Sequence, residues 1–519
     1  MLYIRVVIVL LATIEIQRSQ TAKILSIFGH QGPSQYVFVE PLLVRLAERG
    51  HFVTSITNFP QNGKHDNLRS IVVSENEYLY EANQNFTTTR FGKDHFDVNG
   101  KIFSNGFQIG KNIIENSLVL QMMENEKFDV ILLDLIFSES LYGLVQHFEA
   151  PIVGISTIGS TLSVDALMGN SGPLSYVASL ALTQRYNENM DFRQRCLNLL
   201  SFIFGTIYYH YEYMPVNRKF YRQHFPNATK TMEDIQQQFA SILLNDHYAI
   251  STPRPYVPNM IEVAGLHIPE NPEPLPQDIT SILNNLDSQG FIYVAIENLF
   301  PHNIMKALFK QFEMLNETIV WNAKHTPSSV LLIPANVKIF TNFSHFSILG
   351  HRNCKLLISH GSHLSVIESI HYGVPIIGLT NANGNPGELF NPVDKIETGV
   401  TLKIGTKSLQ NNQIYQTILN VLQNDTYIKL AKLKSIQFRD QQNTPMQRAI
   451  FWVEYVIRHN GADHLRNLGQ NLNTVQFYNI DVWLFICLIV FVTLVICYYI
   501  VNVILKCLRK FHTRKYKNE

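Results

Sequence analysis

Residues 355–378 constrain the fold of this chain more than any other stretch. An apolar run at 355–359 predicts a buried strand, which turns through His360-Gly361-Ser362 into a segment with helical spacing. Gly373 ends that helix, and the apolar residues after it predict another parallel strand. Free backbone N–H groups and the positive end of the helix converge at the turn. The stretch therefore predicts a nucleotide-phosphate site in an α/β fold.

The rest of the chain repeats this alternation of strand and helix in two blocks. Apolar runs predict strands at residues 24–28, 52–56, 128–134 and 151–155 in the first block and at 290–295, 318–321 and 337–340 in the second. Helical spacing with a glycine stop at residues 39–50 predicts the first helix. A proline-rich segment at 268–276 predicts a linker between the blocks.

These patterns divide the chain into domains. We expect an N-terminal domain at residues 23–265, a linker at 266–280 and a C-terminal domain at 281–470. The last domain includes an amphipathic helix at 449–466 that returns toward the first domain.

An aromatic and aliphatic region at residues 176–213 has three interpretations. It belongs to the core, forms the wall of a ligand pocket, or lies on a membrane surface. We favour core or pocket over the membrane.

Both ends of the chain carry targeting patterns. Residues 1–22 have one early positive charge and an apolar run too short to span a bilayer, which predicts a signal peptide rather than a buried first strand. Residues 482–505 contain no charged residue and are long enough for a transmembrane helix. The basic tail at 506–519 predicts that this end is cytosolic and that the earlier residues are luminal.

Two lysines in the tail predict the compartment. Lys515 and Lys517 have the spacing of the KxKxx signal that retrieves type I proteins to the endoplasmic reticulum. A basic flank that snorkels to the membrane surface explains the charges but not their spacing. We therefore expect a type I protein of the endoplasmic reticulum membrane.

Composition excludes one class of partner and limits disulfides. A formal net charge of +1 argues against nucleic acid, because no general basic field is present to neutralise phosphates. Only Cys196 and Cys354 lie away from the apolar C-terminal segment, so at most one intrachain disulfide can form in the lumen. Sequons of a luminal glycoprotein occur at Asn85, Asn227, Asn316, Asn342 and Asn424.

Together with three further stretches, these features resemble a known family. The stretches are LAERGH at 46–51, AGLHI at 264–268 and FWVEYVIRH at 451–459. With the signal peptide, the phosphate stretch and the tail, they resemble the membrane-bound UDP-glycosyltransferases of animals, in an insect-like form. The resemblance implies the GT-B fold, in which two Rossmann-like domains face each other across a cleft, plus one C-terminal transmembrane helix.

The resemblance also implies an enzyme and its substrates. Members transfer a sugar, with inversion, from a UDP-sugar to a small lipophilic hydroxylated acceptor such as a hormone or xenobiotic, which is a detoxification reaction. The UDP-sugar is a co-substrate, and no cofactor or metal is implied. A homo- or hetero-oligomer is a further expected arrangement.

Site residues carry over by position in the phosphate stretch. His360, Gly361 and Ser365 are implied to contact the diphosphate, and Glu368 to hold the ribose hydroxyls. A carboxylate accepts two hydroxyl hydrogen bonds, while a helix N-terminus attracts phosphate charge.

The position of the general base departs from the family. Members use a histidine after a serine in the first loop, supported by a carboxylate. Here the pair is Ser34-Gln35, and a glutamine side chain does not accept a proton at neutral pH. Asp134, at the carboxylate position, is retained. His30 in the same loop is the candidate substitute base.

Three donor-site positions also depart. The family's W-x-P-Q is replaced by Asn342-Phe343-Ser344-His345, whose asparagine is a sequon. The sugar-gripping Asp-Gln pair becomes Gly387-Glu388, where Glu388 still accepts hydroxyl hydrogen bonds. A glycine-serine turn becomes the sequence AIEN at 295–298. The sequence therefore supports two hypotheses: a glycosyltransferase with altered donor use, or an impaired member that acts as a lipophile-binding protein or partner subunit.

Overall fold

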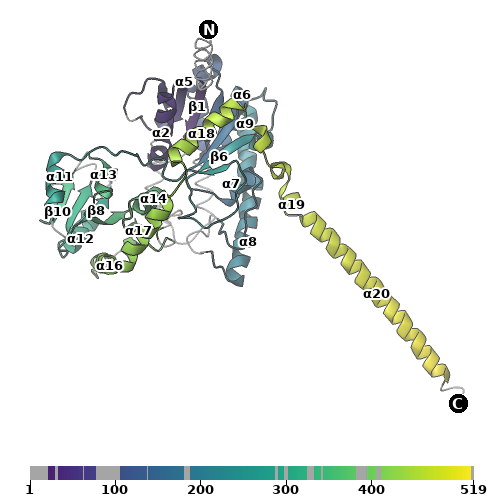
Figure 1. Cartoon of the computed structure of the whole chain (residues 1–519). Helices are drawn as coiled ribbons and strands as arrows, with labels where there is room; N and C mark the ends of the chain where they lie inside the picture. The colour runs from purple at the N-terminus through teal and green to yellow at the C-terminus, as the bar shows by residue number, and fades with distance from the viewer. Residues whose placement is uncertain are drawn as a thin grey trace, which may run out of the picture. The chain divides into compact units, whose positions relative to one another are not determined.

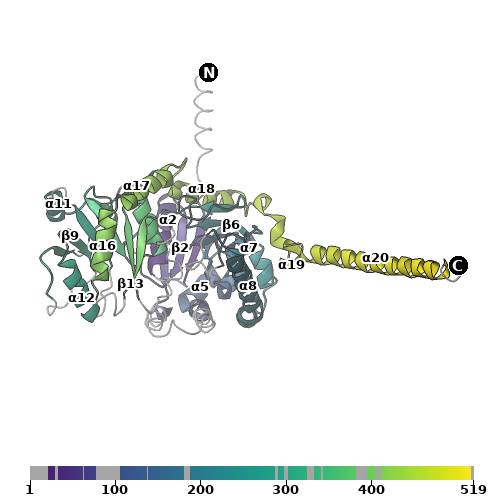
Figure 2. The ribbon, with the colours of Figure 1, turned by 90° about the horizontal axis from the view of Figure 1, so that it is seen from below.

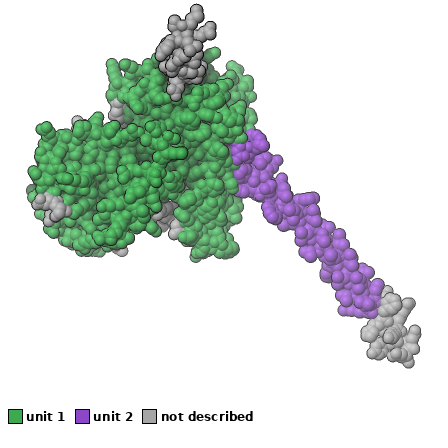
Figure 3. Space-filling view, viewed as in Figure 1, with its two compact units in different colours: residues 1–466 green, residues 467–519 purple. Residues whose placement is uncertain are grey.

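The computed structural model describes residues 21–29, 33–61, 63–76, 106–136, 138–179, 188–286, 290–296, 302–323, 332–340, 343–381, 393, 396–404 and 411–515. The chain divides into two compact units, Met1–Arg466 and Asn467–Glu519 (Figure 3). The first unit contains two parallel sheets (Figures 1 and 2). Because both sheets fall within one unit, the predicted boundaries at residues 265 and 280 stay predictions.

The first sheet has the strand order β3-β2-β1-β4-β5-β6-β7, and every pairing in it is parallel. Its strands are β1 (Lys23–Phe28), β2 (Phe52–Thr57), β3 (Leu68–Val72), β4 (Val130–Asp134), β5 (Ile152–Ser156), β6 (Phe239–Leu244) and β7 (Met260–Glu262). Strands β4, β5 and β6 are buried along their whole length, as is typical of a parallel sheet covered on both faces. The strand order reverses between β1 and β4, which makes this the topological switch point.

Helices cover this sheet on both faces. They are α2 (Pro33–Glu48), α5 (Ser117–Asn125), α6 (Tyr142–Phe148), α7 (Leu162–Leu167), α8 (Phe192–Tyr208), α9 (Met214–His224), α10 (Met232–Gln236) and α18 (Pro445–Arg458), with a further helix at residues 106–115 and short 3₁₀ or π turns at Glu139–Leu141 and Tyr209–Tyr213. Helix α2 starts six residues before the prediction, because Pro33 suits the first position of a helix. Gln35 is therefore in the first turn of a helix.

Helix α18 comes from the far end of the first unit and packs beside α2 (Figure 1). Val453 and Val456 are fully buried in the same cluster as Leu42 of α2. The helix ends at Arg458 rather than at 466, because Asn460 and Gly461 both have positive φ. The predicted return of the chain to the first domain is confirmed, and its predicted length is wrong.

An ion pair anchors this return. Glu454 of α18 accepts hydrogen bonds from Arg49 Nε at 2.6 Å and Arg49 Nη2 at 3.0 Å. The buried His51 lies 3.3 Å from the same carboxylate. Burial opposes ionisation of Glu454, but its hydrogen bonds and ion pairs with Arg49 and His51 lower its pKa below the usual value. The end of the first unit is thus tied to the turn that follows α2.

The second sheet has the order β10-β9-β8-β11-β12-β13 and is also parallel. Its strands are β8 (Phe291–Ala295), β9 (Thr318–Asn322), β10 (Val337–Phe340), β11 (Cys354–Ser359), β12 (Ile376–Asn381) and β13 (Gly399–Ile404). Its helices are α11 (Gln277–Asn284), α12 (His302–Phe312), α13 (His345–Leu349), α14 (His363–Tyr372), α16 (Gln413–Gln423) and α17 (Asp425–Arg439). Strand order reverses between β8 and β11, so the second sheet repeats the topology of the first.

Helix α8 corrects one interpretation of residues 176–213. Asn198 is the one buried residue of this helix. Leu199, Leu200, Ile203, Phe204 and Ile207 are between 42 and 57% exposed, and they share one face at helical spacing. The core interpretation is therefore wrong for this face. The pocket wall and the membrane surface stay open as interpretations.

Within its described residues, 467–515, the second unit contains a 3₁₀ turn at Leu468–Asn471 and two α-helices. They are α19 (Thr474–Phe477) and α20 (Ile480–Lys515). Within α20, residues Ile480–Arg509 include an 18-residue segment with a mean hydropathy of 3.0, and this stretch is long and apolar enough to cross a membrane. The predicted span at 482–505 lies inside it. The predicted signal peptide at residues 1–22 lies outside the described residues except for its last two positions. All five cysteines are unpaired, so the optional disulfide is absent.

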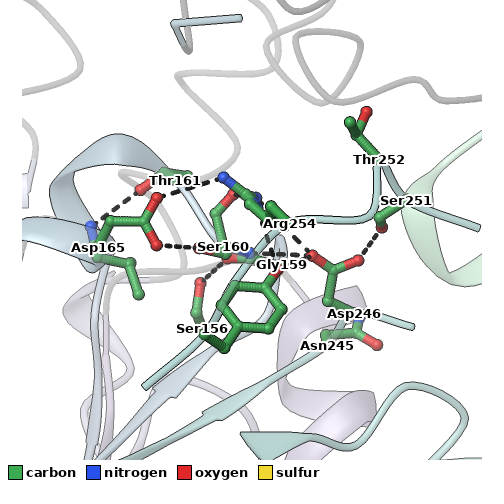
Figure 4. A network of polar contacts seen from close by, with 12 residues as sticks. Ser156, Gly159, Ser160, Thr161, Asp165, Asn245, Asp246, Ser251, Thr252 and Arg254 are labelled. Carbon is green, nitrogen blue, oxygen red and sulfur yellow. Dashed lines mark hydrogen bonds and ion pairs between the residues drawn. The ribbon is translucent and has the colours of Figure 1, made fainter. Parts of the chain in front are cut away.

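A buried charge network joins the loops that follow β5 and β6 (Figure 4). Arg254 Nη1 lies 3.3 Å from Asp165 Oδ2, and Arg254 Nη2 lies 4.0 Å from Asp246 Oδ2. Arg254 Nη2 also donates to the Ser160 carbonyl at 2.6 Å, and the Tyr256 hydroxyl donates to Asp246. Burial raises the pKa of Asp165, although the charge of Arg254 opposes this. The guanidinium of Arg254 therefore neutralises part of the negative charge of two buried carboxylates.

We expect Arg254→Ala to destabilise the first unit by about 3–5 kcal/mol, because it leaves two buried carboxylates without their cation. The matched control is Arg69→Ala, which breaks the pair of Arg69 with Glu126 at 2.8 Å, where the arginine is 53% exposed. Such an exposed pair contributes under about 1 kcal/mol. Thermal unfolding in detergent measures both variants. Equal melting temperatures would contradict a structural role for the network.

Candidate functional site

The first switch point brings two predicted residues to one edge of the sheet. Gln35 is half-buried in the first turn of α2, which follows β1. Asp134 is the last residue of the neighbouring β4 and is fully buried. Its Oδ1 accepts a hydrogen bond from the Ile136 amide at 3.3 Å. The base and carboxylate positions thus share the edge where ligands bind in α/β sheets, and their roles stay predictions. His30 lies outside the described residues.

The second switch point carries the predicted phosphate turn. Strand β11 ends at Ser359, and Gly361 follows in the left-handed region with φ of 70°. Its amide donates to Ser359 Oγ at 3.0 Å. His360, between them, is exposed. This geometry orients the chain into α14 and leaves the exposed turn at the N-terminal end of that helix.

Helix α14 begins with a serine cap. Ser362 is the N-cap, and its side chain accepts a hydrogen bond from the Ser365 amide. The two hydroxyl oxygens of these serines lie 3.0 Å apart. Further amides of the first turn have no partner within an α-helix, so the helix end suits an anion. The predicted limits of this helix are confirmed, including its end at Gly373 with φ of 69°.

A histidine in the first turn of α14 connects it to the first sheet. His363 Nε2 donates to the Asn245 carbonyl at 2.7 Å, just after β6. A carbonyl only accepts, so Nε2 carries the proton. Burial lowers the pKa of His363. His363 was not among the predicted site residues, and its place between His360 and Ser365 was the available signal.

The predicted ribose carboxylate lies between two histidines. Glu368 Oε1 is 3.1 Å from His267 Nε2, and Glu368 Oε2 is 3.0 Å from His345 Nε2. His345 Nδ1 in turn lies 2.8 Å from the Tyr293 hydroxyl. Burial would raise the pKa of Glu368, but the charge and hydrogen bonds of both histidines outweigh it. The pKa therefore lies well below its usual range.

The structure thus brings together some of the predicted residues. Glu368 and His345 are in direct contact, and His360, Gly361 and Ser365 lie on the turn that begins the same helix. His267 and Tyr293 were not among the predicted site residues. His267 lies in the stretch 264–268 that carried the family resemblance, so a polar residue in an apolar segment was the available signal.

Two predicted donor residues, Asn342 and Glu388, lie outside the described residues, as do Glu297 and Gly387. Over the ranges that the structure describes, no group of three or more histidine, cysteine or carboxylate side chains is arranged to hold a metal ion.

Solved structures of glycosyltransferases share the fold. The calicheamicin glycosyltransferase CalG4 aligns with a TM-score of 0.55 and 13% identity, covering 85% of this chain and 99% of its own. TcCGT1, solved in complex with UDP, aligns with a TM-score of 0.52 and 13% identity over 85% of this chain and all of its own. The predicted GT-B fold is confirmed by these likenesses and by the two parallel sheets.

Sequence relatives cover almost the whole chain. UDP-glucosyltransferase 2 of Dactylopius coccus is 29% identical over 509 residues, which is 95% of this chain and 96% of the relative. The family model described as UDP-glucoronosyl and UDP-glucosyl transferase matches residues 8–518. The chain therefore belongs to the UDP-glucoronosyl and UDP-glucosyl transferase family, and is a glycosyltransferase of divergent animal type.

Proposed function

We propose that the protein transfers a sugar, with inversion, from a UDP-sugar to a small lipophilic hydroxylated acceptor. The observation that carries this proposal is the carboxylate of Glu368 on α14, which lies 3.1 Å from His267 and 3.0 Å from His345 behind a serine-capped helix end at the second switch point. The UDP complex of TcCGT1, which has the same fold, supports a uridine diphosphate donor. The UDP-sugar is a co-substrate, and we propose no cofactor or metal.

Each donor group has a candidate partner. The diphosphate binds at the N-terminal end of α14 beside His360, Gly361 and Ser365, where the helix dipole and free amides favour negative charge. The ribose hydroxyls donate to Glu368. Because the pKa of Glu368 is held low, the side chain is an ionised acceptor at neutral pH and makes charge-assisted hydrogen bonds.

The acceptor hydroxyl needs a base, and Gln35 is not one. In this proposal the proton goes to His30, to water held by Asp134, or to solvent from an already acidic acceptor such as a phenol. Buried Asp134 at the end of β4 supports the second route, because it lies at the switch-point edge beside the start of α2.

A second function is favoured by Gln35 itself. A member without a base in the first turn of α2 can retain UDP-sugar or lipophile binding and act as a binding protein or partner subunit. Turnover separates this alternative from the enzyme, because both bind ligand.

We expect Gln35→His to raise UDP release with a phenolic acceptor by about 10²-fold, which is the lower range of general-base catalysis. Gln423→His, at the exposed end of α16, is the matched control and should change nothing. An assay of UDP release measures turnover, and calorimetry with a UDP-sugar measures donor binding. If Gln35→His does not raise UDP release and the protein does not bind the UDP-sugar, the enzyme is ruled out. If the wild type and Gln35→His both bind the UDP-sugar but neither releases UDP, the result favours the binding protein.

We expect Glu368→Gln to raise the KM for the UDP-sugar about 10- to 100-fold, because one charge-assisted partner of the ribose is lost. The control is Glu454→Gln. Glu454 lies on α18, and its carboxylate accepts hydrogen bonds from Arg49. This variant should lower stability and leave the donor KM unchanged. An equal KM in the Glu368 variant and the wild type would remove Glu368 from the donor site.

The apolar α20 and the family relationship suggest membrane association. We propose the finer arrangement: a type I protein of the endoplasmic reticulum with luminal domains and a cytosolic tail. The motif carried by Lys515 and Lys517 supports retrieval, and the exposed apolar face of α8 supports its membrane-surface interpretation.

Replacing both Lys515 and Lys517 with serine should let a fluorescently tagged protein leave the endoplasmic reticulum, which microscopy measures. The control replaces Lys506 and Lys510, which removes the same charge but keeps the KxKxx spacing. Unchanged residence of the first variant would count against a retrieval signal.

A further inference from the structure

The two oxygens of Glu368 have different surroundings. Oε1 contacts His267, which lies between β7 and α11 and whose side chain is completely buried. Oε2 contacts His345, which begins α13 and whose side chain is 25% exposed. One oxygen therefore faces the interior, while the other meets a partner that solvent and ligands can reach.

We propose that His267 is a positioning residue for the donor site: it holds Glu368 by Oε1 so that Oε2 is presented to the ribose, and His345 occupies Oε2 until a donor displaces it. This inference rests on the proposed UDP-sugar binding at Glu368.

Packing keeps His267 in place. Its ring centroid is 6.0 Å from that of Phe38 in α2 and 6.2 Å from that of Phe346 in α13. Its Nδ1 is buried and has no hydrogen-bond partner within the part of the chain that the structure describes. The contact with Glu368 is therefore the hydrogen bond that orients this ring, and turning the ring would leave a buried carboxylate oxygen without its donor.

His345 has a second hydrogen-bond partner, so it can give up its contact with Glu368, whereas His267 has no such partner among the described residues. Its Nδ1 lies 2.8 Å from the hydroxyl of Tyr293, a fully buried residue of β8. If a ribose hydroxyl replaces His345 at Oε2, the histidine keeps this second partner. Displacement by a donor therefore leaves neither the carboxylate nor the imidazole without a hydrogen bond.

The same packing joins the two switch points. Phe38 lies one helical turn after Gln35, and it contacts the ring that holds Glu368. A buried side chain thus connects the helix at the proposed acceptor end with the carboxylate at the proposed donor end.

Two substitutions of His267 test the proposal in the full-length protein. In glutamine the amide nitrogen reaches about as far as Nε2, whereas in asparagine it falls short near the place of Nδ1. Calorimetry with UDP and steady-state kinetics with a UDP-sugar are the measurements. We expect His267→Asn to weaken UDP binding and raise the donor KM about tenfold or more with little change in kcat, and His267→Gln to stay within about threefold of the wild type.

Two further variants complete the test. We expect His345→Ala to strengthen UDP binding rather than weaken it, because the ribose then no longer has to displace the histidine from Oε2 of Glu368. In a Glu368→Gln background, His267→Asn should have no additional effect on the donor KM, because the residues act as one unit. His267→Met, which fills the volume without a donor, replaces His267→Asn if that variant folds poorly.

Several results would overturn the inference. Equal losses in His267→Asn and His267→Gln would show that the ring only fills space, and equal losses in His345→Ala and His267→Asn would show that the two histidines have the same role. Wild-type affinity in all the histidine variants would overturn the positioning role alone. Failure of the wild type to bind UDP would overturn the proposed function and this inference with it.

Discussion

The reversal of strand order is the constraint on which the rest of the structure depends. In a parallel sheet all carboxyl ends lie at one edge, and a crevice for a ligand opens where neighbouring strands send their connections to opposite faces. This chain builds that arrangement twice, between β1 and β4 and between β8 and β11. Gln35, Asp134, His360 and Glu368 all owe their places to it, although they come from four separate segments.

Buried ion pairs stabilise the loops around both of these sheet edges. Arg254 lies between Asp165 and Asp246 beside β5 and β6, and Glu368 lies between His267 and His345 at α14. The two clusters differ in composition. The first is built around a guanidinium that stays charged, whereas the second uses imidazoles, which can exchange between donor and acceptor roles. The Arg254 cluster therefore suits a fixed scaffold, and the Glu368 cluster suits a ligand site.

Much of the fold was predictable because parallel strands read as apolar runs. β1, β2, β4, β5, β8, β9, β10 and β11 lie within two residues of their predictions. Four strands were missed: β3, β6, β7 and β13. β3 is partly exposed and β7 is short, so neither is a long apolar run, whereas β6 is a fully buried apolar run that was nevertheless not predicted. The exposed apolar face of α8 was not predictable, because periodicity shows that apolar residues share a face but not what covers that face.

The site was predictable only in part, because its contacts join residues far apart in the sequence. Ser365 and Glu368 followed from helical spacing and the family resemblance, but nothing local to His267 indicates that it meets Glu368, 101 residues later. His363 is a similar case, since its partner Asn245 is separated from it by 118 residues. Such pairs are properties of the tertiary fold, and a histidine in an apolar stretch is the most that a single sequence offers.

The position of α18 has a consequence for the order in which the molecule is made. Val453 and Val456 complete the same core as Leu42, yet the ribosome adds them long after the strands of the first sheet. At typical synthesis rates the delay is on the order of tens of seconds. Throughout that interval, the face of α2 that α18 later covers remains without this partner on the growing chain.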